Sequence, residues 1–515
     1  MLSSNRNIFS FCILLLPHLA LAQQDTTIYP HSESFHLHYN SYAKNPLLQP
    51  LLKLKNYNSV QLGYRSEEGD YRPSQAPGKQ SDICFYTEGT RQIKKFLVSG
   101  SFGWTNSQAD SQAYTLRHDY KEPNPYYFYT AQPGNWQSIR YDLQGIVSVP
   151  LLKDKFTVGA GAKYNSANNW RSNDPRPEEF SNHMQGNIVA HYRVHTKHVI
   201  GISGGYIRRN TDASWEYRND ANVSRPLLQV FLGNGYGNVE PKVGILKGTL
   251  STLTTGYVAE GVYEGIYNFG TLTLNGKYEN TGTEIFDRPA QQNEKRLDYG
   301  EYNADVYVAS LNWNKVIGLN QFNVLFNYSD ELGKDHNEML AGTAFIYSLE
   351  QVKLHTLWSR LNNERKIKYE LGVSLQLQNQ VKLDGAIGQK AEYQTGEAAI
   401  TGAYYIYFPE NKSMLKTMLS AAFSHPFYAD AKSVAQLFSF TQGVVYRDFY
   451  YFNANTTSIG ANFTYQFPVM KTNAFIQLCG NLVNANIANP KEGLIPWSYP
   501  GSNRVQWQCS IGLNL

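Results

Sequence analysis

Residues 367–378 read IKYELGVSLQLQ, and this alternation constrains the fold more than any other feature of the chain. Apolar residues take every odd position, and polar residues or glycine take the even ones. In a β-strand, a period of two places Ile367, Val373 and Leu375 on one face. Lys368 and Glu370 then lie on the opposite face. Such a strand needs an apolar medium on one side and water on the other, which predicts either a soluble sandwich or a membrane barrel with a wet lumen.

The same alternation recurs along the chain, at 139–150, 156–164, 186–194 and 459–467. The polar face of each segment carries charged or amide groups, as the wall of a water-filled lumen would. From this phase alone we predict which charged side chains line the lumen: Arg140, Lys163, His191, Arg193, Lys368 and Glu370.

The connecting segments alternate between short and long. Short connectors lie at 151–155, 195–198, 317–320, 408–412 and 469–472, and long polar ones lie at 66–80, 107–134, 167–180, 283–300 and 426–453. This rhythm is typical of outer-membrane barrels, whose periplasmic turns are tight and whose outer loops are extended. It predicts an all-β, transmembrane, antiparallel up-and-down barrel of about 16–18 strands, with 14 as the lower alternative. Strand limits within 210–256 and 339–361 stay open, and the phase break between Val308 and Leu311 indicates either a bulge or a misassigned register.

The first 22 residues combine Arg6, an apolar stretch and a small-x-small site at 20–22, which predicts a secretory signal peptide. Without Arg6, 45 basic residues face 42 acidic ones, and so balanced a charge predicts no nucleic-acid partner. No later stretch has the ~20 consecutive apolar residues of a membrane-spanning helix, whereas barrel strands show only half of their residues to lipid. We therefore expect a location in the cell outer membrane, in contact with lipid and lipopolysaccharide.

The chain ends in RVQWQCSIGLNL, another alternating segment. Its last residue, Leu515, is apolar and outward, so the segment resembles the signal that the outer-membrane assembly machinery recognises, although that signal usually ends in Phe or Trp. Cys509 is predicted to face lipid and Cys479 the lumen, and no disulfide should join them because the side chains leave opposite sides of the sheet.

Residues 23–56, before the barrel at 57–515, form a separate predicted unit. Within NPLLQPLLKLKNYNS (45–59), the spacing of the leucines predicts a short amphipathic helix. Its apolar residues are Leu47, Leu48, Leu51, Leu52 and Leu54. The segment is predicted to be a plug inside the barrel, because a wide lumen needs filling, with a seal at the periplasmic rim as the alternative.

Two clusters could suggest ligand chemistry, and each has a plainer explanation. His191, His195 and His198 could hold a metal only if their imidazoles converged, but on a hairpin the first points into the lumen while the others lie in a turn. The glycine run at 231–238 lacks the strand, helix and lysine of a phosphate-binding loop, which favours a flexible loop or an inward constriction.

Two further clusters also favour a structural explanation. Acidic residues at 67–70 and 330–338 could bind calcium or bridge lipopolysaccharide, but they lack EF-hand spacing and are typical of solvated loops. Ser424 and His425 are neighbours on one strand, so their side chains should leave opposite faces instead of pairing as nucleophile and base. We expect no catalytic residue, no metal and no cofactor, and the chain is not predicted to be an enzyme.

Residues 60–104 and the loop Asp174-Pro175-Arg176-Pro177 resemble an uncharacterised family of Bacteroidetes outer-membrane β-barrels, over nearly all of the mature chain. That resemblance implies a location more than an activity. The Asn45-Pro46 entry and the plug resemble the long-chain fatty-acid transporter barrels, which would imply passage of a hydrophobic ligand. No plug domain of the size found in TonB-dependent receptors is present, so active import by this chain alone is not expected.

The leading functional hypothesis is a porin-like channel, or an accessory transporter, that admits a small solute through a plugged lumen, with a hydrophobic solute as one alternative. A TonB-dependent receptor is the neighbouring transporter that it could assist. The alternative is a non-conducting barrel whose long outer loops bind a partner protein or a glycan. A soluble secreted β-protein is the third hypothesis. The ligand itself does not follow from the sequence.

Overall fold

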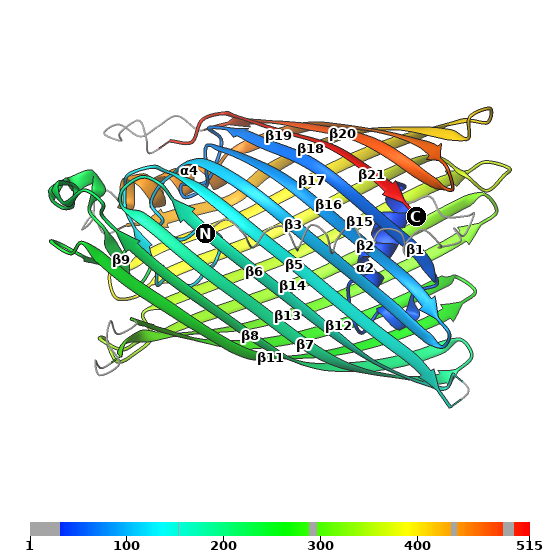
Figure 1. The fold of residues 1–515 in the computed structure, drawn as a ribbon, viewed down its shortest axis with the longest axis horizontal. Helices are drawn as coiled ribbons and strands as arrows, with labels where there is room; N and C mark the ends of the chain where they lie inside the picture. Colours follow the sequence, from blue (N-terminus) through cyan, green and yellow to red (C-terminus); the bar gives the residue numbers. More distant parts are fainter. Residues whose placement is uncertain (1–30, 153, 288–295, 434–439, 488–498) are drawn as a thin grey trace, which may run out of the picture.

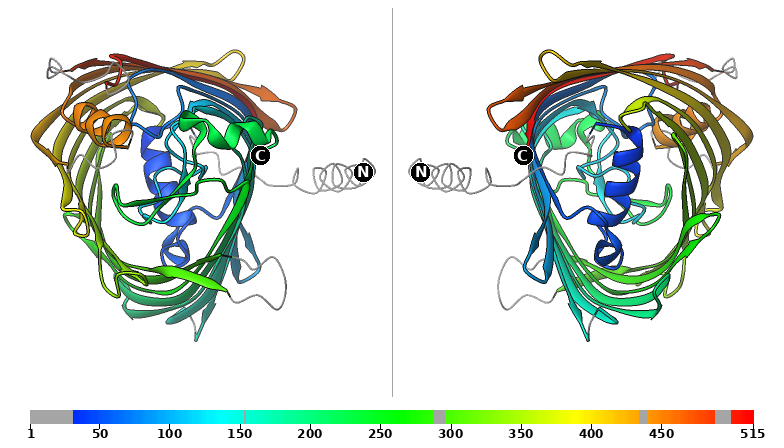
Figure 2. Two further views of the ribbon diagram at one scale, coloured as in Figure 1. Left: turned by 90° about the vertical axis from the view of Figure 1, so that its left-hand side faces the viewer. Right: turned by 90° about the vertical axis from the view of Figure 1, so that its right-hand side faces the viewer.

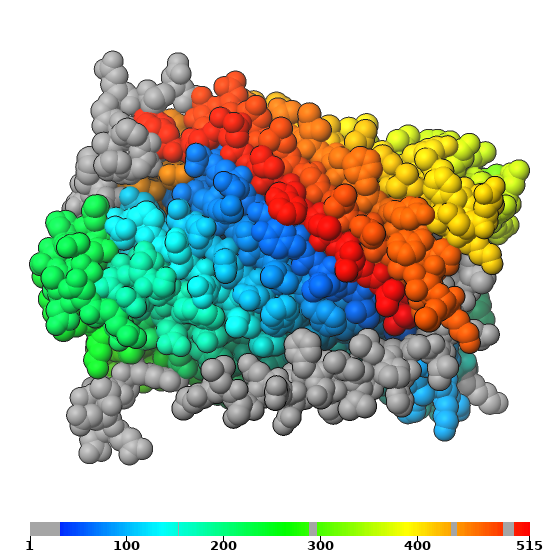
Figure 3. Space-filling model, turned by 45° about the horizontal axis from the view of Figure 1, so that its top comes forward, coloured from blue at the N-terminus to red at the C-terminus, as the bar shows by residue number. Residues whose placement is uncertain are grey.

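In a computed structural model, the chain forms one closed antiparallel β-barrel (Figure 1). The structure describes residues 31–515, except 153, 288–295, 434–439 and 488–498. The sheet has eighteen strands, and each strand pairs with the next along the chain. The last strand, β21 (Asn503–Asn514), pairs with both β20 (Thr472–Asn486) and β1 (Asn56–Gly69), and this closes the barrel. In the space-filling view β21 fills the seam between them (Figure 3). The observed strand number lies within the predicted 16–18, and the alternative of 14 is wrong.

The other barrel strands run in chain order around the wall. They are β2 (Lys79–Ile93), β3 (Phe96–Gln112), β5 (Gly134–Leu151), β6 (Phe156–Arg171), β7 (Arg176–His195), β8 (His198–Glu216), β11 (Lys247–Tyr267), β12 (Gly270–Asp287), β13 (Leu297–Ile317), β14 (Asn320–Asn337), β15 (Phe345–Leu361), β16 (Ile367–Asp384), β17 (Gln389–Phe408), β18 (Ser413–Lys432) and β19 (Asn455–Val469).

Short turns gather at one end of the barrel, called the turn end, and most long connections gather at the other, called the loop end (Figure 1). The barrel strands are 12–21 residues long, more than the ~9–11 residues that cross a bilayer, so the wall extends beyond one membrane thickness. The predicted long loop at 167–180 is wrong, because β6 and β7 continue to within four residues of each other. The sequence 167–180 is mostly polar, and a polar strand that extends beyond the membrane cannot be distinguished from a loop by composition.

The outer surface is apolar in the phase that the alternation predicts. Leu371, Val373, Leu375 and Leu377 of β16 are each about half exposed on the outside. The inner face is polar and includes buried Ser, Thr and Asn side chains on many strands. Ile367 is the exception, since it is buried with Tyr405 and Met414 and its predicted outward orientation is wrong. The pairing of β15 with β16 shifts by one residue between Tyr369 and Ile367, and this reverses the phase at the start of the strand.

Of the two explanations for the phase break between Val308 and Leu311, the bulge is wrong. The pairing of β13 with β14 is continuous from Gly300 to Ile317. Tyr307 is half exposed on the outside, and Val308 therefore faces the lumen although it is apolar. The alternation argument assumes that apolar residues face lipid. Val308 does not follow it, because the lumen of this barrel is filled by segments of its own chain, against which an apolar side chain can lie.

Loop segments fold inward and close the loop end of the lumen (Figure 2). They form a three-stranded sheet of β4 (Phe128–Tyr129), β9 (Phe231–Gly233) and β10 (Val239–Pro241). Short helical turns η2 (Asp220–Ser224) and η3 (Pro226–Leu228) flank this sheet, and η4 (Thr441–Tyr446) continues into α4 (Arg447–Phe452). Tyr129, Val230 and Leu232 are almost fully buried here, within a large core cluster. We call this inward-folded layer the lid.

A helix, α2 (Glu33–Ala43), lies inside the barrel toward the turn end, followed by the 3-10 turn η1 (Gln49–Leu51) (Figure 2). The predicted helix at 45–59 is therefore wrong, because β1 begins at Asn56 and the helix lies one segment earlier. Phe35, Tyr39 and Tyr42 are spaced four and three apart and share one face of α2, whereas Pro50 restricts the following segment to a short turn. None of the described helices is long and apolar enough to cross a membrane.

Candidate functional site

The N-terminus of α2 is bound to the barrel wall through one carboxylate, that of Glu370. Glu370 is almost fully buried and accepts hydrogen bonds from the backbone amides of Glu33 (2.8 Å) and Ser34 (3.1 Å). It also accepts from the hydroxyls of Ser359 (3.0 Å) and Tyr405 (2.5 Å) on the neighbouring strands. A helix N-terminus presents unpaired amides and a partial positive charge, and a buried carboxylate satisfies both.

A second wall residue, Lys416, binds the segment just before α2. Its ammonium group donates to the backbone carbonyl of His31 (2.9 Å) and to the carboxylate of Glu33 (2.5 Å). The imidazole Nε2 of His31 lies 2.9 Å from the amide nitrogen of Asn514, so the amide donates to a neutral imidazole. Burial, with smaller effects from His36 and Lys416, lowers the pKa of His31 to about 3. The start of the described chain is thus seated on the last strand of the barrel.

The remainder of residues 31–54 touches the wall on several other strands. Tyr39 hydrogen bonds to Thr90 on β2 (3.2 Å), and Tyr42 hydrogen bonds to Thr273 on β12 (2.7 Å). The side-chain amide of Gln49 donates to Ser99 on β3 (3.2 Å), and its carbonyl accepts from Ser148 on β5. Bonds to strands that lie far apart around the wall fix the segment across the lumen instead of along one side.

One wall glycine is shaped for this segment. A Cβ atom built on Gly161 of β6 would lie 2.5 Å from Cγ of Pro46. Only a residue without a side chain allows Pro46 to approach β6 so closely. Leu47, Leu48 and Leu52, which follow, are buried with Tyr39 and Tyr42, and their role as plug residues stays a prediction.

A cavity of about 420 Å³ remains between residues 31–54 and one arc of the wall. Its wall side carries hydroxyls, amides and a carboxylate: Glu264, Thr271, Thr273, Asn312, Asn314 and Gln321. Burial, with a smaller effect from Lys53, lowers the pKa of His38 in its lining to about 4. This turn-end cavity leaves a polar space beside α2.

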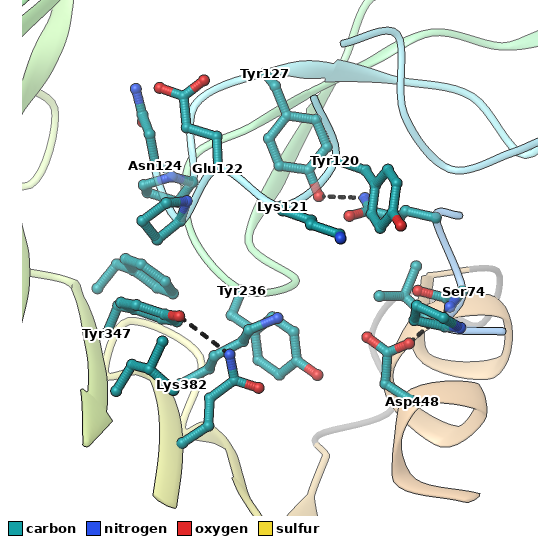
Figure 4. Close-up of a pocket in the computed structure, with 18 of the residues that line it drawn as sticks. Ser74, Tyr120, Lys121, Glu122, Asn124, Tyr127, Tyr236, Tyr347, Lys382 and Asp448 are labelled. Carbon is teal, nitrogen blue, oxygen red and sulfur yellow. Dashed lines mark hydrogen bonds between the residues drawn. The ribbon is translucent and has the colours of Figure 1, made fainter. Parts of the chain in front are cut away.

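A second cavity, of about 490 Å³, lies under the lid and reaches down the wall formed by β15 and β16 (Figure 4). We call this cavity the vestibule. Aromatic rings, amides and charged groups share its lining, among them Gln75, Arg117, Tyr120, Lys121, Glu122, Tyr127, Tyr236, Tyr347, Gln351, Gln378, Gln380, Lys382, Asp448 and Tyr451. The amide of Gln380 donates to the Tyr347 hydroxyl (3.1 Å). Aromatic surface with a few placed polar groups is the usual composition of a small-molecule site.

Two of the vestibule's charged groups come from the wall and from the lid. The ammonium of Lys382 on β16 lies 5.4 Å from the centre of the Tyr236 ring. The carboxylate of Asp448 on α4 accepts from the backbone amide of Ser74 (2.8 Å). Burial raises the pKa of Asp448, against the opposing effects of Lys382 and of the hydrogen bonds from Ser74. The vestibule therefore holds this carboxyl group in a state that resists ionisation.

The predicted lumen residues fall into three groups. Glu370 and His191 are both buried, and His191 forms a hydrogen bond with the backbone of Leu47. Arg140 forms an ion pair with Asp142 on its own strand (2.9 Å), and Lys163 on β6 pairs with Gln144 of β5. These placements do not test a role in transport, so that role stays a prediction.

The third group contains the last two predicted lumen residues, Arg193 and Lys368. Arg193 donates to backbone carbonyls of the turns at Asp154 (3.3 Å) and Thr196 (3.4 Å), where it lies exposed at the turn end. Lys368 is exposed at the register shift between β15 and β16, where it has no partner in the strand pairing.

The histidine and serine clusters do not assemble into a site. In the described part of the chain, no group of three or more His, Cys, Asp or Glu side chains could hold a metal. The ring of His425 stacks with that of Phe423 on the outer face, 6.4 Å between ring centres, whereas Ser424 points to the other side. The three described cysteines, Cys84, Cys479 and Cys509, are free thiols.

The loop clusters are structural in this fold. Asp335 accepts the Tyr126 hydroxyl (2.9 Å) and the Ala344 amide (2.8 Å), and it thereby ties the lid to β14. The glycine run at 231–238 includes β9 and turns inward, and a Cβ on Gly235 would clash with Asp384. That segment is thus part of the lid, as the inward-constriction alternative predicts.

Sequence reasoning missed most of the vestibule. Lys382 could have been found, because it continues the even-numbered phase of β16 from Glu370 through Gln378 and Gln380. The segment KEPNPYYFYT at 121–130, dense in proline and tyrosine, was a further signal of an ordered loop. Nothing local indicates that Asp448 or Tyr236 meets these residues, because the approach depends on how three loops fold inward.

The fold defines the class: a large antiparallel β-barrel with an apolar outer face, whose lumen holds segments of its own chain. The chain belongs to a family of unknown function, DUF6850, whose model matches residues 46–515. This agrees with the predicted membership of an uncharacterised family. The Bacteroidetes assignment and the likeness to fatty-acid transporters stay predictions. No curated protein matches the chain.

Solved structures share the barrel with little sequence identity. The ferric citrate transporter FecA in its unliganded form is 8% identical, with 90% of this chain and 79% of that chain covered and a TM-score of 0.42. The alcaligin outer membrane receptor FauA from Bordetella pertussis is 7% identical, with 89% and 76% covered and a TM-score of 0.40. OccK9 (OpdG) from Pseudomonas aeruginosa is 10% identical, with 89% and 97% covered and a TM-score of 0.36. Likeness at this level carries no information about a ligand.

Proposed function

We propose that the protein is an outer-membrane channel or accessory transporter whose residues 31–54 act as a plug. The observation that carries this proposal is the seating of α2 inside the lumen by polar groups from many wall strands. A segment that merely sealed a periplasmic rim would not need a buried carboxylate, a buried ammonium and a wall glycine fitted to it. The apolar outer face supports insertion in a bilayer.

The arrangement suits a gated path more than an open pore. The lid covers the vestibule at one end, and residues 31–54 cross the lumen at the other, with the polar turn-end cavity beside α2. A solute would enter the vestibule, pass into the lumen and leave once α2 shifts. The vestibule's amides, rings and charged groups favour a small amphipathic solute over a purely hydrophobic one.

The competing function is a barrel that only anchors outer loops for a protein or glycan partner. Lid segments that pack inward around Tyr129 and Leu232 use their apolar surface within the barrel, which favours closure of the lumen over display of the loops. Lipid, lipopolysaccharide, the assembly machinery and a TonB-dependent receptor stay the predicted partners.

Planar-bilayer conductance tests the proposal. The full chain should pass little steady current, and deletion of residues 23–54, which leaves β1 whole, should open a stable conductance. The point variant Gly161→Val should raise the open fraction, since its side chain displaces Pro46, whereas Gly186→Val, whose Cβ would meet open space, should not. A folded deletion variant that passes no current would favour the anchor.

A further inference from the structure

The vestibule holds more positive charge than its own carboxylates can neutralise. Glu122 already has two cationic neighbours, with Nη1 of Arg117 at 4.0 Å and Nη1 of Arg209 at 3.9 Å from its carboxylate. Asp448 is occupied by the Ser74 amide, and its burial raises its pKa. Asp448 attracts Lys382 at longer range, but neither carboxylate forms an ion pair with either of the two lysines that line the same cavity.

Lys121 and Lys382 approach the cavity from opposite layers. Lys121 lies in the connection between β3 and β4 at the loop end, and Lys382 lies on the wall strand β16. Both amines project toward the centre of the vestibule (Figure 4). Within the described part of the chain, neither amine forms an ion pair. Lys121 lies 5.7 Å from the centre of the Tyr120 ring, and Lys382 lies 5.4 Å from that of Tyr236, with Asp448 acting on it only at longer range.

We propose that the vestibule binds a small organic carboxylate, whose carboxylate group lies between Lys121 and Lys382 and whose ring body lies among the surrounding aromatic side chains. This inference rests on the proposed function, because it assigns a substrate class to the path through the lumen. Two ammonium donors on opposite sides can each bind one carboxylate oxygen, which a neutral solute could not exploit.

The rest of the lining fits such a ligand. Tyr236 from the lid and Tyr347 from the wall strand β15 supply ring surface, and the side chains of Gln351 and Gln378 supply hydrogen-bonding groups. A purely inorganic anion would leave this aromatic surface without a partner, and an organic cation would meet the two amines. The volume of about 490 Å³ lies within the range of small-molecule sites.

Benzoate and benzamide are suitable probes, since they have nearly the same shape and differ in charge. Equilibrium binding to the full chain in mild detergent should show benzoate binding at least about tenfold more tightly than benzamide, because a hydrogen bond to a charged group is worth ~1.5–3 kcal/mol. Lys382→Met and Lys121→Met should each weaken benzoate about tenfold or more and leave benzamide nearly unchanged. Lys353→Met, on the lumen face of β15 away from the vestibule, is the matched control.

The outcomes separate this inference from the proposed function. Equal binding of the two probes, or full benzoate affinity in both lysine variants, would overturn the carboxylate site. Uptake of solutes into liposomes by the chain lacking residues 23–54, without preference for benzoate, would keep the channel and overturn the site. Lysine-dependent benzoate binding without any uptake would support the carboxylate site and contradict the proposed channel function. Each variant should first show the heat-sensitive gel migration of a folded barrel.

Discussion

The replacement Glu370→Gln tests the seating of α2 most directly. Two of the four hydrogen bonds that the buried carboxylate accepts come from α2, through the amides of Glu33 and Ser34. Hydrogen bonds to a charged acceptor contribute ~1.5–3 kcal/mol each, and a carboxylate at a helix N-terminus contributes up to ~2 kcal/mol through the dipole. Glutamine keeps one acceptor oxygen but loses the charge and places an amide group near another donor.

We therefore expect the substitution to weaken the seated state by about 2–3 kcal/mol. That corresponds to roughly a 30- to 150-fold fall in the ratio of seated to unseated α2. Single-channel recording should show this as a higher open probability at constant unit conductance, because the barrel wall is unaltered. The unit conductance separates unseating of α2 from damage to the barrel.

Glu331→Gln provides the matched control, since Glu331 is a half-buried carboxylate on the lumen face of β14 that lies outside the contacts of α2. The reasoning fails if the open probability of a folded Glu370→Gln barrel equals that of the wild type. It also fails if Glu331→Gln raises the open probability equally, because the effect would then come from lumen charge and not from the helix terminus.

Further predictions follow from burial and charge. The pKa of His31 is lowered to about 3 when α2 is seated, so the seated state is most stable above the ordinary histidine pKa of 6.5. As the pH falls below 6.5, the seated state loses stability, by about 2 kcal/mol at pH 5. The open probability should therefore rise from pH 7.5 to pH 5, and it should rise less in His31→Gln. Val373→Lys on the outer face should cost ~2–4 kcal/mol and lower the yield of folded barrel in lipid, whereas Gln376→Lys on the lumen face should not. Leu232→Ala should destabilise the lid by ~2–5 kcal/mol and expose the loop end to protease on intact cells, whereas Leu227→Ala, at a position 67% exposed, should change cleavage little.

The sequence predicts those features of the structure that depend on neighbouring residues, and it does not predict those that depend on distant segments. The alternation around Val373 and Leu375 reports a two-sided environment residue by residue, so the barrel and the phase of Glu370 could be inferred from it. Ile367 escaped the same reasoning, because a one-residue register shift is set by the pairing partner. Val308 escaped it because an apolar residue can face a lumen that is filled by protein.

The contents of the lumen were harder to predict for a different reason. The leucines at 47–52 are buried, but the helix before them is defined by aromatic residues, and its periodicity covers only three turns. The vestibule depends on contacts between loops that lie hundreds of residues apart, such as that between Ser74 and Asp448. No pattern within either loop predicts that contact, so the available signals were the even phase of Lys382 and the proline- and tyrosine-rich segment at 121–130.

The closing strand β21 has a consequence for biogenesis. Strand β1 remains an unpaired edge until the last dozen residues of the chain arrive, so the ring cannot be completed while the protein is still being exported. Asn514, which lies in that strand, also donates a hydrogen bond to the imidazole of His31. Loss of strand β21 would therefore remove two features together: the strand pairing that closes the barrel and the hydrogen bond that holds His31 to the wall.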